Sequence, residues 1–265
     1  MKRNSDIIMK SENNVLISRL NAFRIVNNNA LGSNIKQFGT TLAFQVQQIP
    51  GPAFNTVRNL NGEDLIYFSD IETWYNEQNM GFQIEVTPHN ASQEVFRQLH
   101  KCSFYQTGFH ASFIGDIQEV VDTTTTSNFE VELLQKEEFT DFADVYVRGF
   151  GLPEFITEGV KQNNEILYDI GGWRFFKATL QGKIVGIAVL YVQDDIATLA
   201  AATTLSEYRG QGIQKALIQA RAQYALPQGA KYITSEAQFG SISHSNMQKS
   251  MMDLVYTKAI YNKNT

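Results

Sequence analysis

Two periods of hydrophobic residues run along this chain, and its second half shows them most clearly. Apolar residues recur every three or four positions in some segments, which predicts helices, and aromatic or β-branched residues form short runs in others, which predicts strands. We expect helices within 136–150, 153–167, 206–225 and 243–252, and strands at 129–134, 173–180, 183–192, 196–205, 231–237 and 254–261.

The first half shows the same alternation of elements. Pairing helix and strand starts across the halves, as Asp64 with Gln211 and Phe82 with Lys231, gives a nearly constant separation along the chain. This spacing predicts one strand-helix-strand-helix-strand plan used twice, without visible sequence identity. The expected strands lie at 40–49, 54–60, 82–88 and 107–114, and the expected helices at 63–78 and 91–104.

A threonine-rich segment, 120–128, separates the two halves and is the best candidate for a linker. We therefore predict two domains, 1–122 and 129–265. The fold class is α/β, with a twisted mixed β-sheet flanked by helices in each domain.

Composition narrows the function. With 43% hydrophobic and 18% charged residues, the chain is globular in character, and its net charge of −5 offers no general attraction to nucleic acid or to an anionic membrane. Cys102 is the only cysteine, which excludes an intrachain disulfide and is interpreted as a small buried side chain. With four scattered histidines beside it, no zinc-ligand spacing exists, so we expect no metal.

No segment resembles a membrane anchor or a secretion signal. The N-terminal residues mix short apolar groups with charges and asparagines, and the longest apolar stretch, 184–192, is too short to span a bilayer. We expect a cytoplasmic protein.

The stretch with the most chemical content is "YRGQGIQKAL", residues 208–217. Its glycines allow backbone amides to approach a ligand closely, and the helix that follows adds unpaired N–H donors and a positive dipole end. Such a turn suits a phosphate or pyrophosphate, although a plain connection without a ligand is the alternative. A Rossmann turn fits poorly, because Lys215 stands where a third small residue belongs, and the P-loop pattern is absent.

The turn resembles the acyl-CoA signature of the GNAT superfamily of N-acetyltransferases, Q/R-x-x-G-x-G/A, with Gln214 in place of the small last residue. A longer side chain there must point aside. The strands around 183–205, the "SEY" before the arginine, the segment 228–237 and the closing helix and strand also follow the GNAT order. The resemblance covers roughly the C-terminal half.

This resemblance implies that acetyl-CoA is the co-substrate and that its acetyl group passes to a primary amine by direct attack. The pyrophosphate would rest on the turn, and the pantetheine arm would pair with a strand edge, where a backbone N–H also polarises the thioester carbonyl. The residues assigned to CoA are Ala202, Thr203, Thr204, Arg209, Gly210, Gln211, Gly212, Ile213, Gln214 and Lys215.

The proton-transfer residues are less defined. Many GNAT proteins carry a tyrosine near the position of Met247, and related ones carry serine and asparagine in that helix, which points to Ser243 and Asn246. A helix cap or a structural contact also accounts for both. Glu236, at the end of a strand, is the candidate base, although a solvated glutamate fits equally well. His244 is interpreted as exposed, and Tyr256 as a core residue.

In the first half, Gly62 occupies the corresponding turn, but Glu63 and Asp64 stand where the phosphate would sit. Carboxylates stabilise that helix end themselves and repel a diphosphate. This copy is therefore expected to bind no CoA and to shape the acceptor pocket, with Trp74 and Tyr75 as candidate lining residues.

Three functions are compatible with these residues: an N-acetyltransferase, a non-catalytic acyl-CoA sensor, and an interaction domain with an unused glycine turn. The expected partner is a small-molecule or peptide amine, without nucleic acid or membrane. The sequence leaves open the identity of the amine and the choice between monomer and homodimer.

Overall fold

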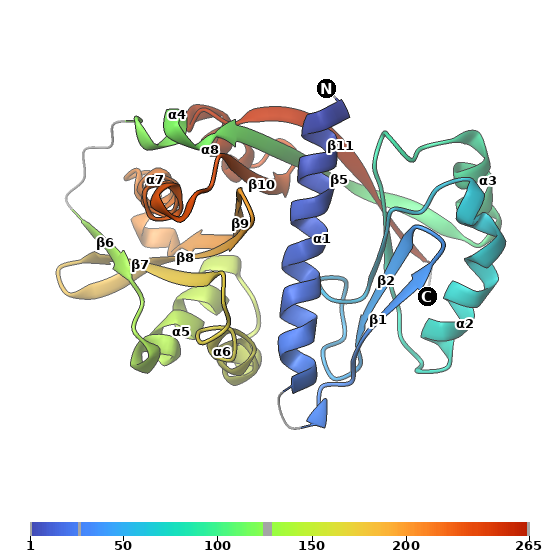
Figure 1. The fold of residues 1–265 in the computed structure, drawn as a ribbon. Coiled ribbons are helices and arrows are strands. Elements are labelled where there is room, and N and C mark those ends of the chain that lie inside the picture. Colours follow the sequence, from blue (N-terminus) through green and yellow to red (C-terminus); the bar gives the residue numbers. More distant parts are fainter. Residues whose placement is uncertain (1, 26–27, 124–128, 264–265) are drawn as a thin grey trace. The chain divides into compact units, whose positions relative to one another are not determined.

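The computed structural model describes residues 2–25, 28–123 and 129–263 (Figure 1). They divide into two compact units, each assembled from separate stretches, so that neither unit coincides with one half of the sequence. Unit 1 draws on Met1–Val15, Phe113–Glu236 and Gly240–Val255, and unit 2 on Leu16–Ser112, Ala237–Phe239 and Tyr256–Thr265.

Unit 2 is built on a mixed sheet. Its strands follow the hydrogen-bonded order β1-β2-β3-β4-β11, in which β3 and β4 are parallel and the other neighbours antiparallel. Its elements are the second part of α1 (Lys2–Ile25), β1 (Ser33–Phe38), β2 (Thr41–Val46), β3 (Thr56–Arg58), α2 (Phe68–Asn76), β4 (Gln83–Val86), α3 (Gln93–Lys101), β5 (Phe104–Asp116) up to Ser112, and β11 (Asp253–Lys263) from Tyr256.

Helices α2 and α3 lie side by side in Figure 1 and bury the apolar stripe that their sequences predict. Ile71 and Tyr75 of α2 share a core with Val95 and Leu99 of α3, in each case four residues apart. Ser92 caps α3, its Oγ accepting the Val95 N–H at 3.3 Å. Full burial of an apolar side chain of this size contributes roughly 1.5–3 kcal/mol, so the stripe determines the face that packs inward.

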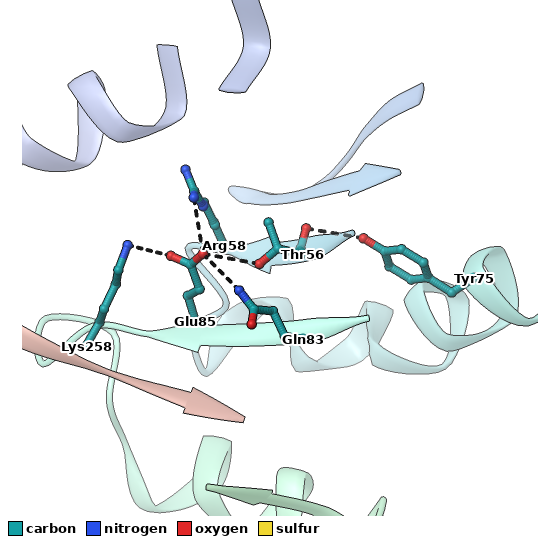
Figure 2. Close-up of polar contacts among 6 residues, drawn as sticks. All are labelled: Thr56, Arg58, Tyr75, Gln83, Glu85 and Lys258. Atoms are coloured by element: carbon teal, nitrogen blue, oxygen red, sulfur yellow. Dashed lines mark hydrogen bonds and ion pairs between the residues drawn. The ribbon is translucent and has the colours of Figure 1, made fainter. Parts of the chain in front are cut away.

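The sheet of unit 2 also carries a buried ionic cluster, which Figure 2 shows across β3, β4 and β11. Glu85 accepts from Arg58 Nη2 at 3.1 Å through Oε1 and from Lys258 Nζ at 2.6 Å through Oε2. Thr56 Oγ1 and Gln83 Nε2 approach Oε1 at 3.3 and 3.4 Å. Glu85 and Lys258 are 5% and 0% exposed, so the charges are matched inside the protein rather than by water.

Burial alone would raise the pKa of Glu85, but the charges of Arg58 and Lys258 and their hydrogen bonds outweigh it and hold the pKa below its ordinary value. The carboxylate therefore stays ionised in the folded protein well into the acidic range.

The strands of unit 1 include the hydrogen-bonded series β10-β9-β8-β7-β6, with β9 and β10 parallel and the remaining pairs antiparallel. Helix α7 lies on one face, and α5 and α6 lie on the other (Figure 1). The elements are the first part of α1 up to Val15, the end of β5 from Phe113, α4 (Ile117–Val121), β6 (Glu130–Leu133), α5 (Phe139–Phe150), α6 (Thr157–Glu165), β7 (Trp173–Leu180), β8 (Lys183–Gln193), β9 (Ile196–Thr204), α7 (Ile213–Ala225), β10 (Tyr232–Gln238), α8 (Ile242–Lys249) and the start of β11 up to Val255.

Because helices cover both faces, the centre of β8 is a continuous buried run from Val185 to Tyr191 rather than an alternating one. Between β7 and β8, Gln181 and Gly182 have φ angles of 51° and 74°, the pair of positive values that a tight hairpin requires. The hairpin predicted at this position is confirmed.

The repeated plan is present in the order of the elements. β3, α2, β4, α3 and β5 in the first half correspond to β9, α7, β10, α8 and β11 in the second, and each series begins with a parallel strand pair. Every strand and helix expected from the periodicity has a counterpart among these elements.

Several features were not expected. The sequence patterns did not predict α1, β1 or α4, and Cys102, interpreted as a small buried side chain, is only partly buried. The linker expected at 120–128 begins inside α4, and residues 124–128 lie outside the described part of the chain. The domain boundaries 1–122 and 129–265 stay a prediction. The compact groups of residues in the structure are units 1 and 2 as described above. Among the described residues, no helix has the length and hydropathy needed to cross a membrane.

Candidate functional site

At its C-terminal end, β9 is no longer paired with β10. The parallel register with β10 runs from the Ile196–Tyr232 pair to the Leu199–Ser235 pair, whereas β9 continues to Thr204. On the other side, β8 stays paired with β9 as far as Thr204. Residues 201–204 therefore have a strand neighbour in β8 but lie beyond the ladder with β10.

A β-bulge lies where the two ladders differ. Val189 of β8 faces Ala201 of β9, but the next pair is Leu190 with Leu199, so Ala200 is the extra residue. A bulge bends its strand and increases the local twist. This accounts for the loss of pairing between β9 and β10 directly after Leu199.

The direction of the backbone groups follows from one hydrogen bond. The Leu205 N–H donates to Val185 O of β8 at 2.9 Å. Because these groups alternate along a strand, Thr203 and Ala201 also direct theirs to β8. Ala202 and Thr204 direct theirs to the open edge, where an extended ligand can pair as an added strand.

The glycine turn leads from this edge into α7. Gly210 and Gly212 have φ angles of 80° and 83°, and a Cβ built on either would meet no atom within 4 Å. Gly212 is the N-cap and supplies no side-chain cap, and the first turn of α7 carries no acidic residue. The N–H groups and positive dipole end of this 13-residue helix therefore face open space, which is the requirement for an anion site.

The Arg209 side chain donates hydrogen bonds to two backbone carbonyls of the protein. Its Nε donates to Thr204 O at 3.1 Å, and its Nη2 donates to Gly149 O at 2.7 Å, so it fastens the turn to the end of β9 and to α5. Gly149 lies so close to Thr203 that an added Cβ would approach Thr203 Oγ1 to 2.5 Å. Arg209 thus shapes the turn, in addition to placing a positive charge beside it.

Gln214, the residue that departs from the signature, points toward α8 as expected. Its Nε2 donates to Ser243 Oγ at 3.1 Å, and its Oε1 accepts from Asn246 Nδ2 at 2.5 Å. The structure therefore brings together three candidate residues, and it makes them a polar tie between α7 and α8. The N-cap of α8 is Ser241, whose Oγ accepts the His244 N–H at 3.1 Å.

Two neighbours on α8 are buried. Met247, at the position where the GNAT resemblance would place a tyrosine, is 4% exposed. The interpretation of His244 as an exposed residue is wrong, because it is 8% exposed and its ring packs edge-on against Phe113 with 5.1 Å between centroids.

Glu236 follows Ser235, the last β10 residue paired with β9, so it stands where the two strands part. It is exposed, whereas Ser235 is buried. Tyr256 belongs to unit 2 and is partly buried, as a residue at the edge of a core would be.

Beside the first turn of α7 lies a hollow of about 560 Å³. Lys215 and Lys249 line it, together with Glu119 of α4 and Asp122, which directly follows α4. The hollow thus carries two cations and two carboxylates, with Lys215 in the first turn of α7.

The corresponding turn of unit 2 is filled by its own side chains. Asp64 is buried and accepts from the N–H and Oγ1 of Thr40 at 2.9 and 2.8 Å and from Thr41 Oγ1 at 2.9 Å. Burial opposes this charge, but these hydrogen bonds lower the pKa of Asp64 below its ordinary value. Asn61 Oδ1 accepts the Glu63 N–H at 2.9 Å. The turn thus provides its own anion, which supports the expectation that it takes no phosphate.

The two aromatic candidates of unit 2 differ. Tyr75 is fully buried and donates its hydroxyl to Phe44 O at 2.6 Å, so its assignment to a pocket wall is wrong. Trp74 lines a hollow of about 440 Å³ together with Tyr67 and Asp70.

Comparison of the sequence with family models gives one match, in which residues 139–243 fit the acetyltransferase (GNAT) family. This range includes the glycine turn, β9, Glu236 and Ser243. A search of curated proteins found no match.

Solved structures resemble the chain over most of its length. A protein of unknown function from Staphylococcus epidermidis ATCC 12228 has a TM-score of 0.70 and 13% identity, covering 91% of this chain and 96% of its own. A GCN5-related N-acetyltransferase from Kribbella flavida has a TM-score of 0.69 and 11% identity, covering 95% of each chain. A tandem GNAT protein from the clavulanic acid biosynthesis pathway has a TM-score of 0.59 and 10% identity, covering 78% of this chain and 74% of its own. These likenesses confirm the expected fold class, a tandem arrangement of mixed α/β sheets flanked by helices.

Proposed function

We propose that this chain, whose residues 139–243 match the GNAT acetyltransferase family, is an acyl-CoA-dependent N-acetyltransferase that acts on a primary amine. One observation carries the proposal: the uncapped N-terminus of α7 opens next to the edge of β9 that has no β10 partner. An anion site beside an unpaired strand edge matches a ligand with a diphosphate at one end and an amide-containing arm at the other.

The residues of this chain fit such a ligand. The space around Gly210 and Gly212 admits phosphate oxygens to the amides, and Lys215 with Lys249 supplies charge beside them. Ala202 and Thr204 offer backbone groups toward the arm, except that the Thr204 carbonyl already accepts from Arg209. Acetyl-CoA supplies an activated acetyl thioester, and the protein's contribution is to align it with the amine.

In the proposed reaction, Glu236 removes a proton from the substrate ammonium, directly or through a water molecule. The amine nitrogen then attacks the thioester carbon, and the Ala202 N–H stabilises the oxyanion that forms. Collapse of the adduct breaks the carbon–sulfur bond, and the remaining ammonium proton passes to the departing sulfur. The products are the acetamide, CoA thiol and one proton, which Glu236 releases to solvent.

The experiment that tests this proposal follows thiol release from acetyl-CoA in the presence of a panel of primary amines. We expect release that depends on one class of amine and saturates with it. CoA should also raise the melting temperature, because it binds the native state and not the unfolded chain. If neither CoA nor acetyl-CoA changes the melting temperature, the anion site is wrong.

A sharper test substitutes the turn. Gly212→Asp places a carboxylate against the helix N-terminus, and we expect CoA affinity to fall at least about 100-fold, because the charge both repels the diphosphate and occupies its donors. Gly212→Asn has nearly the same shape without the charge, and it should retain most of the affinity.

A second control separates strain from charge. Gly229→Asp has a comparable φ of 90° and equally open surroundings, but it lies at the other end of α7. Isothermal titration with CoA compares the three variants. Equal losses in Gly212→Asp and Gly229→Asp would show that strain, not the cradle, determines binding.

A second candidate function is a non-catalytic acyl-CoA sensor, which the burial of Met247 at the usual tyrosine position favours. It predicts tight CoA binding without thiol release from any amine in the panel.

A further inference from the structure

Arg221 of α7 is a fully buried charge outside the residues discussed so far. It is 0% exposed, and it points from the helix into the sheet of unit 1. Its Nε donates to Leu217 O of its own helix at 2.9 Å. Its Nη1 donates to Val189 O at 3.1 Å and to Ala201 O at 3.3 Å, and the buried Nη2 has no hydrogen-bond partner among the described residues.

The described residues offer Arg221 no carboxylate partner, and burial alone lowers its pKa to about 9. It therefore remains charged at neutral pH, held by peptide carbonyls only. An unpaired buried charge is costly, and an apolar side chain of similar size would pack in its place without that cost. The charge thus calls for a role other than filling the core.

The two carbonyls that Arg221 holds belong to the residue pair beside the bulge. Val189 and Ala201 face each other, and the register shifts directly after them. Arg221 therefore fixes β8 and β9 together at the point where the ladder is interrupted. This is also the point beyond which β9 leaves β10.

The Ala201 carbonyl belongs to the same peptide group as the Ala202 N–H. A cationic donor on the carbonyl oxygen polarises the peptide and strengthens its N–H as a donor. The alternation of backbone groups directs this N–H to the open edge of β9, opposite to the carbonyl that Arg221 binds.

We propose that Arg221 is a positioning residue for acyl transfer, which fixes the bulge of β9 and polarises the Ala201–Ala202 peptide so that the Ala202 N–H binds the thioester oxygen. This inference rests on the proposed function for the location of the thioester. The guanidinium touches no substrate and acts through the peptide group.

The test uses Arg221→Met, which keeps an unbranched side chain and removes the charge, and Arg221→Lys, which keeps the charge with fewer donors. Ile218→Val, also buried on α7, controls for altered packing. For Arg221→Met we expect kcat to fall about 10–100-fold, less than the roughly 10²–10³-fold loss of a whole oxyanion donor. CoA affinity should change less than about threefold, the melting temperature should not fall, and Arg221→Lys should recover part of kcat.

A spectroscopic readout does not require turnover. The carbonyl stretching band of bound acetyl-CoA, labelled with ¹³C at the carbonyl, should lie at lower frequency in the wild-type protein than in water, and Arg221→Met should move it back. An unchanged band, or a joint loss of kcat, CoA affinity and melting temperature that Ile218→Val reproduces, would overturn the inference. A shifted band without turnover of any amine would instead overturn the proposed enzyme and leave the role of Arg221 standing.

Discussion

The side chain of Gln214 connects three of the residues to which the sequence drew attention. Its amide joins Ser243 and Asn246, so the two polar residues of α8 are engaged with α7. An amide and a hydroxyl held in this way orient a helix better than they transfer protons, since neither titrates near neutral pH. Glu236, exposed where β9 and β10 part, remains the candidate for proton transfer.

Glu236→Gln tests that role. The variant keeps the size of the side chain but cannot accept a proton, and we expect kcat to fall about 100-fold or more with little change in CoA affinity, as loss of a general base predicts. The pH dependence of the rate should also change, because the group that accepts the proton is gone. Glu130→Gln, an exposed strand glutamate on β6, is the matched control. An unaltered rate at every pH would exclude Glu236 as the base.

At the scale of single residues, the sequence predicts those features that depend only on neighbouring residues. The glycines of the turn are explained by the backbone freedom that the turn needs. The sideways direction of Gln214 is explained by the length of its side chain. Arg221 could not be found in this way, because a charged residue within a helical pattern is normally interpreted as solvent-exposed. Its burial depends on a bulge formed by two strands far from it in the sequence.

The cluster around Glu85 is the clearest case in which interactions act between elements. Three strands contribute to it, and β11 reaches it from the far end of the sequence (Figure 2). Breaking a buried ion pair by removing one partner leaves an uncompensated charge. The cluster therefore makes the pairing of β3, β4 and β11 sensitive to a single side chain.

Glu85→Gln should destabilise the protein by about 3–5 kcal/mol in urea unfolding at pH 7, because the buried Lys258 and the partly buried Arg58 lose the charge of the Glu85 carboxylate. The native pKa of Glu85 lies below its unfolded value of 4.5, so its contribution is present above about pH 4.5 and is lost as the pH falls through the native pKa. The variant should therefore show a shallower decline of unfolding free energy between about pH 5 and 3.

Glu72→Gln is the control for this prediction, because Glu72 pairs with Lys263 at 2.6 Å in a less buried setting. Exposed pairs of this kind contribute about 0–1 kcal/mol. Similar losses for the two variants, or an unchanged pH slope for Glu85→Gln, would contradict the assigned burial of the cluster.

Elements with a clean period were predictable, and those without one were not. Helix α1 buries Ile8, Leu16, Leu20 and Phe23, but asparagines and charges interrupt the spacing between them. Strand β11 was expected as a strand, yet its pairing with β4 was not, because strand pairing across the whole chain leaves no local signal. The open edge of β9 likewise depends on long-range register.

On the scale of the whole molecule, the two compact units share the sequence unevenly. Unit 1 includes the first residues of the chain, where Ile8 is buried and Ser11 Oγ accepts from Thr234 Oγ1 at 3.0 Å. Unit 2 includes the last strand, with Lys258 at its ion cluster. Each unit thus contains buried residues that lie far along the sequence from most of its other residues.

Cutting the chain in the threonine-rich segment tests this. We expect fragments 1–128 and 129–265, made separately, to show no cooperative thermal unfolding, because unit 2 loses β11 and unit 1 loses the start of α1. Mixing them should restore a cooperative transition followed by circular dichroism. A sharp transition in fragment 129–265 alone would show that the C-terminal half is an autonomous domain.

The place of β11 also has a consequence for biosynthesis. A ribosome completes the residues of β4 long before those of β11, so Glu85 and Arg58 emerge long before Lys258. Multidomain proteins commonly fold from the N-terminus during translation, but here β4 has no β11 partner until the residues of β11 have been synthesised. During that interval β4 presents an unpaired strand edge, the feature through which chains associate edge to edge.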